Sequence, residues 1–189
     1  APGTYLLTVT DAANGCTATA ETEVSEDVAA PQISVLLPAV LTCALNSQTL
    51  QGQNAMPAGN FTYLWSTPDG NIISGENTLK PEIDAPGTYT LLVTNTMNGC
   101  TAAAETEVSE DLTAPEVTVA PPARLTCAVT TLALHGTNAA PSGSFSYLWT
   151  ASNGGNIVSG GNTLQPEINA AGIYNLLATN TTNGCTAVA

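Results

Sequence analysis

Cysteine is the residue type whose chemistry and spacing are most informative in this sequence. Five cysteines occur in 189 residues: Cys16, Cys43, Cys100, Cys127 and Cys185. Thiols in such numbers act as disulfide partners or metal ligands, or they are buried as free thiols. A metal site is disfavoured because the sequence has no Cys-x-x-Cys pair and only one histidine. Disulfides are therefore the favoured interpretation, with buried free thiols as the alternative.

The cysteines follow an internal repeat of about 84 residues, which is the size of a small domain. When the chain is shifted by one repeat, with one extra position beyond the inserted Gly155, the cysteines superpose in two series: Cys16, Cys100 and Cys185, and Cys43 and Cys127. The segment AETEVSED at 20–27 recurs unchanged at 104–111. The sequence therefore predicts an array of domains.

Short linkers set the expected domain boundaries. SEDVAAPQ at 25–32 and SEDLTAPE at 109–116 combine acids, small residues and a proline, a composition typical of linkers. The repeat predicts the last two strands, F and G, of an upstream domain in residues 1–27, and a complete domain in 28–111. It also predicts a domain in 112–189 that lacks the end of its last strand. A hairpin as short as 1–27 buries too little apolar surface to fold alone, so the chain is interpreted as a window from a longer polypeptide.

The repeat assigns one pair of cysteines to each domain. It predicts the bridges Cys43–Cys100 and Cys127–Cys185, and it leaves Cys16 to an upstream partner. A bridge that closes about 57 residues stabilises a fold by about 4 kcal/mol in the chain-entropy model. Disulfides persist outside the cytosol, so an extracellular protein is expected.

The apolar pattern predicts strands and no helix. FTYLW at 61–65 and YTLLV at 89–93 alternate large apolar side chains with residues that point the other way. Turn motifs such as PDGN and DAPG separate these short segments. Helix-favouring runs of Lys, Arg and Glu are missing. The sequence therefore predicts an all-β protein of tandem two-sheet sandwiches.

The charged residues argue against an enzyme and against nucleic-acid binding. The net charge is −13, and the only cations are Lys80 and Arg124, so a polyanion is repelled. Lys80, Arg124 and His135 are all replaced in the other repeat, so we expect no acid–base or nucleophilic site common to the repeats. No apolar stretch reaches the roughly 18 residues of a membrane span.

The motif DAPGTYTLLVT at 84–94, with YLWST at 63–67 upstream, resembles the tandem immunoglobulin-like and PKD-like repeats of giant bacterial cell-surface adhesins of the Bacteroidota type. The resemblance extends over both repeats. It implies immunoglobulin-like sandwiches in a secreted, cell-surface protein of cell adhesion. It also implies that Tyr5, Tyr89 and Tyr174 form tyrosine corners and that Trp65 and Trp149 pack in the cores.

The sequence departs from antibody-type domains at one position of strand F. Leu7, Leu91 and Leu176 stand two residues after the corner tyrosine, where those domains carry a cysteine. The resemblance therefore implies that any bridge joins different strands, namely an early edge strand and strand G.

The acidic linkers contain the one candidate metal site. Glu26, Asp27, Glu110 and Asp111 lie where consecutive domains meet, and carboxylate oxygens suit Ca²⁺. The alternative is a solvated hinge whose charges discourage edge-to-edge aggregation. The sequence indicates no other cofactor.

Outward-facing leucines predict contacts between copies of the chain. Alternation places Leu64 and Leu92, and in the next repeat Leu148 and Leu177, on the outer face of neighbouring strands. A sparsely charged face that recurs in each domain suits lateral bundling. The alternative is ordinary packing within each sheet.

We expect a structural and adhesive function: the stalk of a large extracellular filament or surface adhesin. The expected partners are other copies of the same chain and an unknown host, prey or surface ligand. One alternative is an array of glycan- or protein-binding modules that use the loops at 54–60 and 138–144. The other is an S-layer or sheath protein.

Overall fold

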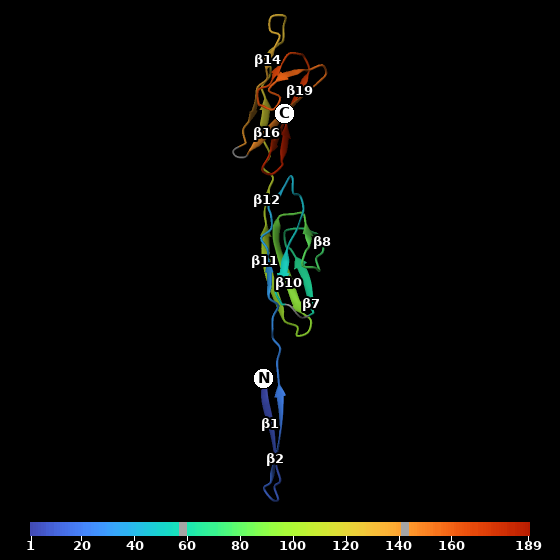
Figure 1. Ribbon diagram of the computed structural model, residues 1–189, viewed down its shortest axis with the longest axis vertical. Helices are drawn as coiled ribbons and strands as arrows, with labels where there is room; N and C mark the ends of the chain where they lie inside the picture. The colour runs from blue at the N-terminus through green and yellow to red at the C-terminus, as the bar shows by residue number, and fades with distance from the viewer. Residues whose placement is uncertain (57–59, 141–143) are drawn as a thin grey trace.

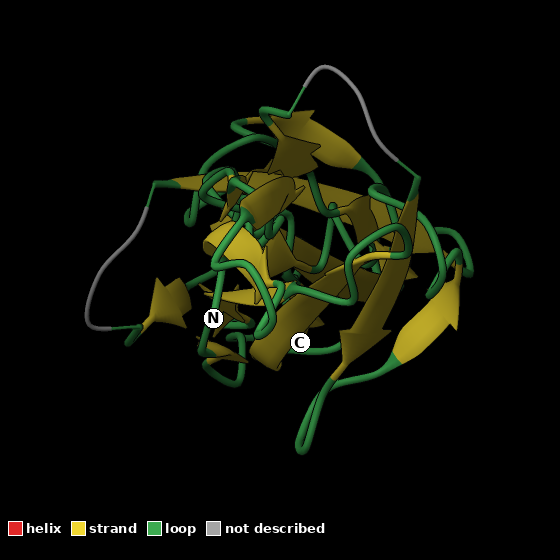
Figure 2. Cartoon of the chain, turned by 90° about the horizontal axis from the view of Figure 1, so that it is seen from below, coloured by secondary structure: helices red, strands yellow, loops and turns green. Residues whose placement is uncertain are grey.

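The computed structural model describes residues 1–56, 60–140 and 144–189. The molecule is a rod in which a hairpin and two β-sandwiches follow one another along the long axis (Figure 1). The described residues form strands, turns and loops but no helix (Figure 2). The predicted all-β fold is therefore confirmed.

The N-terminal hairpin consists of two antiparallel strands, β1 (Gly3–Thr10) and β2 (Thr17–Val24). Every residue of both strands is exposed. Its turn carries the sequence Asn-Gly-Cys at 14–16, which recurs in each sandwich.

The first sandwich is built from strands that lie between Ile33 and Asp111. Its strands are β3 (Ile33–Val35), β4 (Leu41–Thr42), β5 (Gln48–Thr49), β6 (Gly52–Asn54), β7 (Phe61–Ser66), β8 (Ile72–Ser74), β9 (Glu82–Ile83), β10 (Gly87–Asn95), β11 (Thr101–Val108) and β12 (Glu110–Asp111). One sheet has the order β11-β10-β7 and another has the order β5-β9-β8; β3 pairs with β6, and β12 pairs with β4. Buried residues of these strands, together with Leu50 between β5 and β6, form one core, made of Leu41, Leu50, Trp65, Ile83, Tyr89, Leu91, Val93 and Val108.

An apolar contact occupies the place of the antibody-type disulfide. Leu91 is fully buried, and its Cδ2 lies 2.8 Å from the position that a Cβ on Gly52 would take. Trp65 packs in the same core, and its indole Nε1 donates to the Thr78 carbonyl at 2.9 Å. No cysteine is needed inside this sandwich, because leucine and glycine fill the space between the sheets.

The tyrosine corners form as the resemblance implies. The Tyr89 hydroxyl donates to the Ala85 carbonyl at 2.7 Å, and it accepts from the backbone N–H of Asn71 at 3.0 Å. Burial raises the pKa of this hydroxyl. The Tyr174 hydroxyl makes the equivalent bond to the Ala170 carbonyl at 2.7 Å.

The second sandwich repeats this architecture in strands that lie between Val117 and Val188. Its strands are β13 (Val117–Val119), β14 (Leu132–Ala133), β15 (Gly136–Asn138), β16 (Phe145–Ser152), β17 (Ile157–Ser159), β18 (Glu167–Ile168), β19 (Ile173–Asn180) and β20 (Thr186–Val188). One sheet has the order β16-β19-β20 and another has the order β14-β18-β17; β13 pairs with β15. Its core centres on Leu134, Trp149, Ile168 and Leu176.

Candidate functional site

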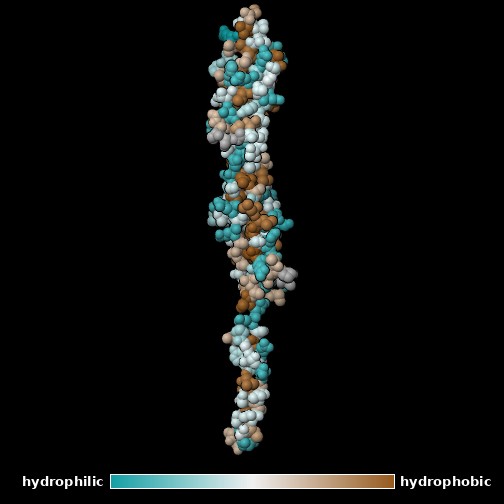
Figure 3. Space-filling view, turned by 60° about the vertical axis from the view of Figure 1, so that its left-hand side comes forward, coloured by the Kyte–Doolittle hydropathy of each residue, from teal (hydrophilic) through white to brown (hydrophobic). Residues whose placement is uncertain are grey.

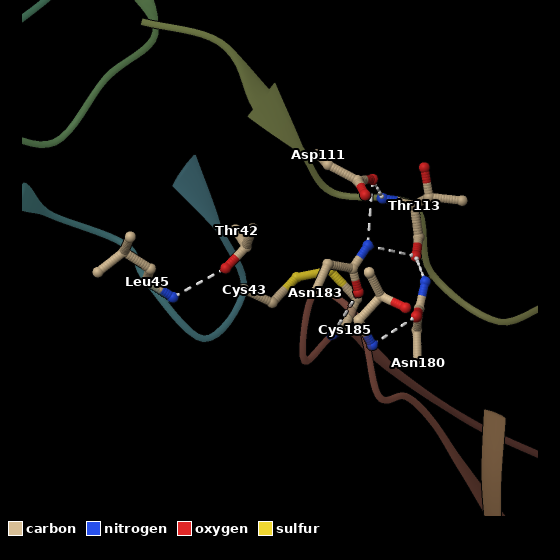
Figure 4. The surroundings of a disulfide bond; sticks show 9 residues. Thr42, Cys43, Leu45, Asp111, Thr113, Asn180, Asn183 and Cys185 are labelled. Atoms are coloured by element: carbon tan, nitrogen blue, oxygen red, sulfur yellow. Dashed lines mark hydrogen bonds between the residues drawn. A yellow bond between two sulfur atoms is a disulfide. The ribbon is translucent and has the colours of Figure 1, made fainter. Parts of the chain in front are cut away.

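The two sandwiches are joined by a disulfide between Cys43 and Cys185 (Figure 4). The two Cα atoms lie 5.0 Å apart, although 142 residues separate the cysteines in sequence. The predicted bridges Cys43–Cys100 and Cys127–Cys185 are therefore wrong. Within the described residues Cys16, Cys100 and Cys127 are free thiols. The sulfur chemistry of this chain thus lies between domains rather than inside them.

The predicted pairing fails because the two cysteines of one domain lie at opposite ends of the sandwich. Cys43 follows β4, which pairs with β12 just beyond the last residue of β11, whereas Cys100 comes directly before the first residue of β11. An eight-residue strand spans about 26 Å. A disulfide needs Cα atoms within about 7 Å. The implied clip between an early edge strand and strand G is therefore also wrong.

The linker is bound to the end of the first sandwich. Strand β12 pairs in parallel with β4, which places Glu110 opposite Leu41 and Asp111 opposite Thr42. The Leu41 N–H also donates to the Ser109 carbonyl at 2.9 Å. This pairing fixes the linker beside Cys43, so the chain enters the second sandwich from a defined position.

The Asn-Gly-Cys turn of the second sandwich forms hydrogen bonds to that linker. The Asn183 side-chain amide donates to Asp111 Oδ1 at 3.1 Å and to the Thr113 carbonyl at 3.0 Å. The Asn180 amide donates to the same carbonyl at 3.1 Å. In return, the Ala44 N–H donates to the Asn183 carbonyl at 3.1 Å. Backbone and side-chain hydrogen bonds therefore surround the disulfide on both sides (Figure 4).

Gly184 lets the two sandwiches approach each other at this turn. Its φ is +76°, and a Cβ at this position would lie 2.6 Å from the Ala44 Cβ. A side chain here is thus opposed both by the left-handed backbone and by the neighbouring domain. The Asn-Gly-Cys sequence thus supplies the three groups on which the junction depends: the side-chain amide, the glycine and the thiol.

The aspartates of the linkers accept hydrogen bonds from amides. The backbone N–H and the side chain of Thr113, together with the Asn183 amide, hold the pKa of Asp111 below its usual value. The Ala29 N–H and the Asn98 amide lower the pKa of Asp27 in the same way. Sequence reasoning missed both asparagines, although each stands in an Asn-Gly-Cys motif.

The calcium candidates are not gathered into a cluster. Glu26 and Glu110 are exposed, and the carboxylates of Asp27 and Asp111 are engaged by the amides of Asn98 and Asn183. Across residues 1–56, 60–140 and 144–189, no group of three or more His, Cys, Asp or Glu side chains is placed to hold a metal ion. The junction that the structure shows is an amide–carboxylate contact.

The four outward leucines form two cross-strand pairs. Leu64 lies directly opposite Leu92, and Leu148 lies directly opposite Leu177. Leu64 and Leu148 are each 47% exposed, and Leu92 is 38% exposed; Leu177 is half-buried. Hydrophobic residues surface in several patches along the rod (Figure 3).

The loops of the binding-module alternative are described only in part. Residues 57–59 of the loop at 54–60 and residues 141–143 of the loop at 138–144 lie outside the described residues.

Among the described residues, no helix is both long and apolar enough to cross a membrane.

Comparisons with known proteins found one family match and several similar solved structures. A family model described as a PKD-like domain matches residues 114–189. No curated protein matches the chain. Similar solved structures include the eight N-terminal immunoglobulin domains of Down syndrome cell adhesion molecule, at 14% identity and a TM-score of 0.47 over 100% of this chain. They also include three N-terminal domains of the Hoc outer capsid protein of bacteriophage RB49, at 19% identity and a TM-score of 0.39 over 84% of this chain.

The chain spans 30% of the first of these structures and 56% of the second. The chain is an all-β protein, and its residues 114–189 match the model of a PKD-like domain.

Proposed function

We propose that this chain is a load-bearing spacer segment of a large extracellular bacterial filament or surface adhesin. The observation that carries the proposal is the bridge between Cys43 and Cys185, which joins two successive sandwiches end to end. A spacer must transmit position and force from one domain to the next, and a covalent link between domains serves that purpose. Disulfides persist outside the cytosol, which supports an extracellular location.

The junction is built to resist bending. A single peptide linker leaves two domains free to rotate about it, and relative domain motion is the default for small interfaces. Here the linker is itself a strand of the first sandwich, and the disulfide adds a second covalent connection beside it. The Asn183 amide binds the linker between these two connections. Rotation about any one of them is opposed by the other two.

We predict that loss of the bridge turns the rod into a hinged pair of domains. Solution X-ray scattering on the native chain should give one extended shape with a single maximum dimension. The variant Cys43→Ser, which keeps the linker but removes the bridge, should give a broader distribution with a smaller mean radius of gyration. Cys127→Ser is the matched control, because Cys127 occupies the same repeat position and is unbonded. A native chain as flexible as Cys43→Ser would overturn the spacer proposal.

A lateral contact between rods is supported by the paired leucines. Each sandwich carries a cross-strand leucine pair, of which Leu64, Leu92 and Leu148 are exposed and Leu177 is half-buried. Near the first pair, Thr62, Thr90 and Thr94 belong to the same two strands. Side-by-side association of identical chains would cover this face in each domain.

We predict that changing Leu64, Leu92, Leu148 and Leu177 together to Thr abolishes higher assemblies of the native chain, as measured by light scattering. Threonine suits an exposed strand, so each sandwich should keep its fold and its circular dichroism spectrum. Leu37→Thr is the control, since Leu37 is 92% exposed and lies outside the leucine pairs. Assemblies of unchanged mass in the fourfold variant would show that the leucines only pack within their own sheets.

A further inference from the structure

The far end of the second sandwich carries the same cysteine turn that forms the bridge in the first. Around Cys43, the Thr42 N–H donates to the Leu45 carbonyl at 2.9 Å, and the Leu45 N–H donates to Thr42 Oγ1 at 3.0 Å. Around Cys127, Thr126 and Val129 make the same two bonds at 2.9 and 3.0 Å. Cys127 is nevertheless exposed and unbonded. One half of a second junction is thus already in place.

The near end of the first sandwich carries the other half. The Asn98 amide donates to Asp27 Oδ1 at 3.0 Å and to the Ala29 carbonyl at 3.1 Å, as Asn183 does to Asp111 and Thr113. Gly99 has the same φ of +76° as Gly184.

The two turns differ in what faces them. Ala44 packs against Gly184, whereas in the described chain no atom outside residues 98–100 lies within 4 Å of the position of a Cβ on Gly99. The turn at Cys100 therefore has the geometry of the junction but not its partner.

We propose that Cys127 bonds to the Asn-Gly-Cys turn of a following repeat, and that Cys100 bonds to the Thr-Cys turn of a preceding repeat. By the same register, Cys16 bonds to the Thr-Cys turn of the repeat before its own domain. Each bond forms when two thiols lose two protons and two electrons to a disulfide oxidant, which is itself reduced to two thiols. Formation of the Cys43–Cys185 bridge requires the same class of oxidant.

A groove at the end of the second sandwich fits this arrangement. It has a volume of about 450 Å³, and its lining includes Leu125, Ile168 and Tyr174. The corresponding residues of the first sandwich, Leu41, Ile83 and Tyr89, share their core with the buried Val108 near the end of strand G. An ETEVSED segment after Ala189 would supply that valine to the second sandwich.

An array with this bonding contains two covalent tracks. Each track alternates a disulfide with the segment that leads from an Asn-Gly-Cys turn to the next Thr-Cys turn, as from Cys16 to Cys43 or from Cys100 to Cys127. Such a segment already runs along most of two stacked domains (Figure 1), and its full extension is only about 90 Å. The two tracks are staggered by one domain. The array would therefore resist stretching even if its sandwiches unfolded.

The test lengthens the native chain by one repeat. Residues 105–189 are appended after Ala189, because Ala189 occupies the repeat position of Ala104. The appended copy carries Val188→Ile as a mass marker. The chain is oxidised with glutathione disulfide and mapped as peptides without reduction. We expect Cys127 of the original sequence to be bonded to the marked Cys185, with Cys43 still bonded to the unmarked Cys185.

A second variant keeps the test decisive. With Cys127→Ser in the original sequence, the marked Cys185 should react with a thiol reagent in the folded protein. Bonding of the marked Cys185 to the cysteine of its own domain, or a free marked Cys185 in the parent extended chain, would overturn the inference. The mechanical consequence rests on the proposed spacer function, but the pairing does not. If the native chain is stiff but the marked Cys185 stays free, the bonding of every repeat is rejected and the spacer function is not.

Discussion

Replacing Cys43 by serine is expected to split one unfolding transition into two and to move both to lower denaturant. With the bridge intact, neither sandwich can unfold alone without becoming a closed loop. The unfolded second domain would be held at the linker and at Cys185, and the unfolded first domain at Cys43 and at the linker. Each of these loops contains about 70 residues, which corresponds to about 4.4 kcal/mol of stabilisation in the chain-entropy model.

The same bridge adds little more once both domains are unfolded. The loop then contains the 142 residues between the cysteines, and the model gives about 5 kcal/mol for its closure. The bridge therefore raises the free energy of the state with one unfolded domain almost as much as that of the state with two unfolded domains. The bridge couples the two sandwiches by roughly 4 kcal/mol, which suppresses the half-unfolded intermediate.

Urea unfolding followed by circular dichroism and by tryptophan fluorescence measures this coupling. Trp65 and Trp149 report on separate cores, so single-tryptophan variants follow each domain. In the oxidised chain the two probes should give coincident transitions, and in Cys43→Ser they should separate. Cys127→Ser should behave as the native chain. Coincident transitions at unchanged midpoints in Cys43→Ser would contradict the predicted coupling.

The strands and the cores follow from local sequence patterns. Alternation in FTYLW correctly predicts that Trp65 is buried and that Leu64 is exposed, because side chains on a strand alternate between faces. The corner role of Tyr89 is also confirmed, since the DAPGTY motif holds the hydroxyl near the Ala85 carbonyl. These features depend on residues close in sequence, so one repeat contains the information.

The disulfide register does not follow from the repeat. Pairing Cys43 with the next Asn-Gly-Cys turn or with the one after it satisfies the same periodicity, and only the distance along the sandwich decides between them. The hydrogen bonds of Asn183 to Asp111 and Thr113 also cross the domain boundary. The recurring Asn-Gly-Cys motif was the signal for this contact. A tight turn needs the glycine but does not need an asparagine before it and a cysteine after it in every repeat. The sequence alone does not show that this turn bonds to the neighbouring domain.

Pulling the chain by its two ends is expected to extend it about four times less in oxidising buffer than after reduction. Load that enters at residue 1 reaches Cys43, crosses to Cys185 and leaves at residue 189, so residues 44–184 carry no tension. About 48 residues remain in the path, with a stretched length of about 170 Å at roughly 3.5 Å per residue. The reduced chain has all 189 residues in the path, or about 660 Å. Optical tweezers with handles at both termini measure this limit.

The bypassed segment explains why this result tests the function and not only the bond. Residues 44–184 include Trp65 and Trp149, so both cores lie outside the load path. From the two sandwiches, tension can peel away only β3, β4 and the short strand β20. The reference protein carries Ser at Cys16, Cys100 and Cys127, which prevents bonds between molecules without changing the bridge. Cys43→Ser in this background should extend as the reduced chain does in either buffer. A reference protein that approaches the length of the reduced chain while its bridge is intact would show that the junction does not shield the domains from force.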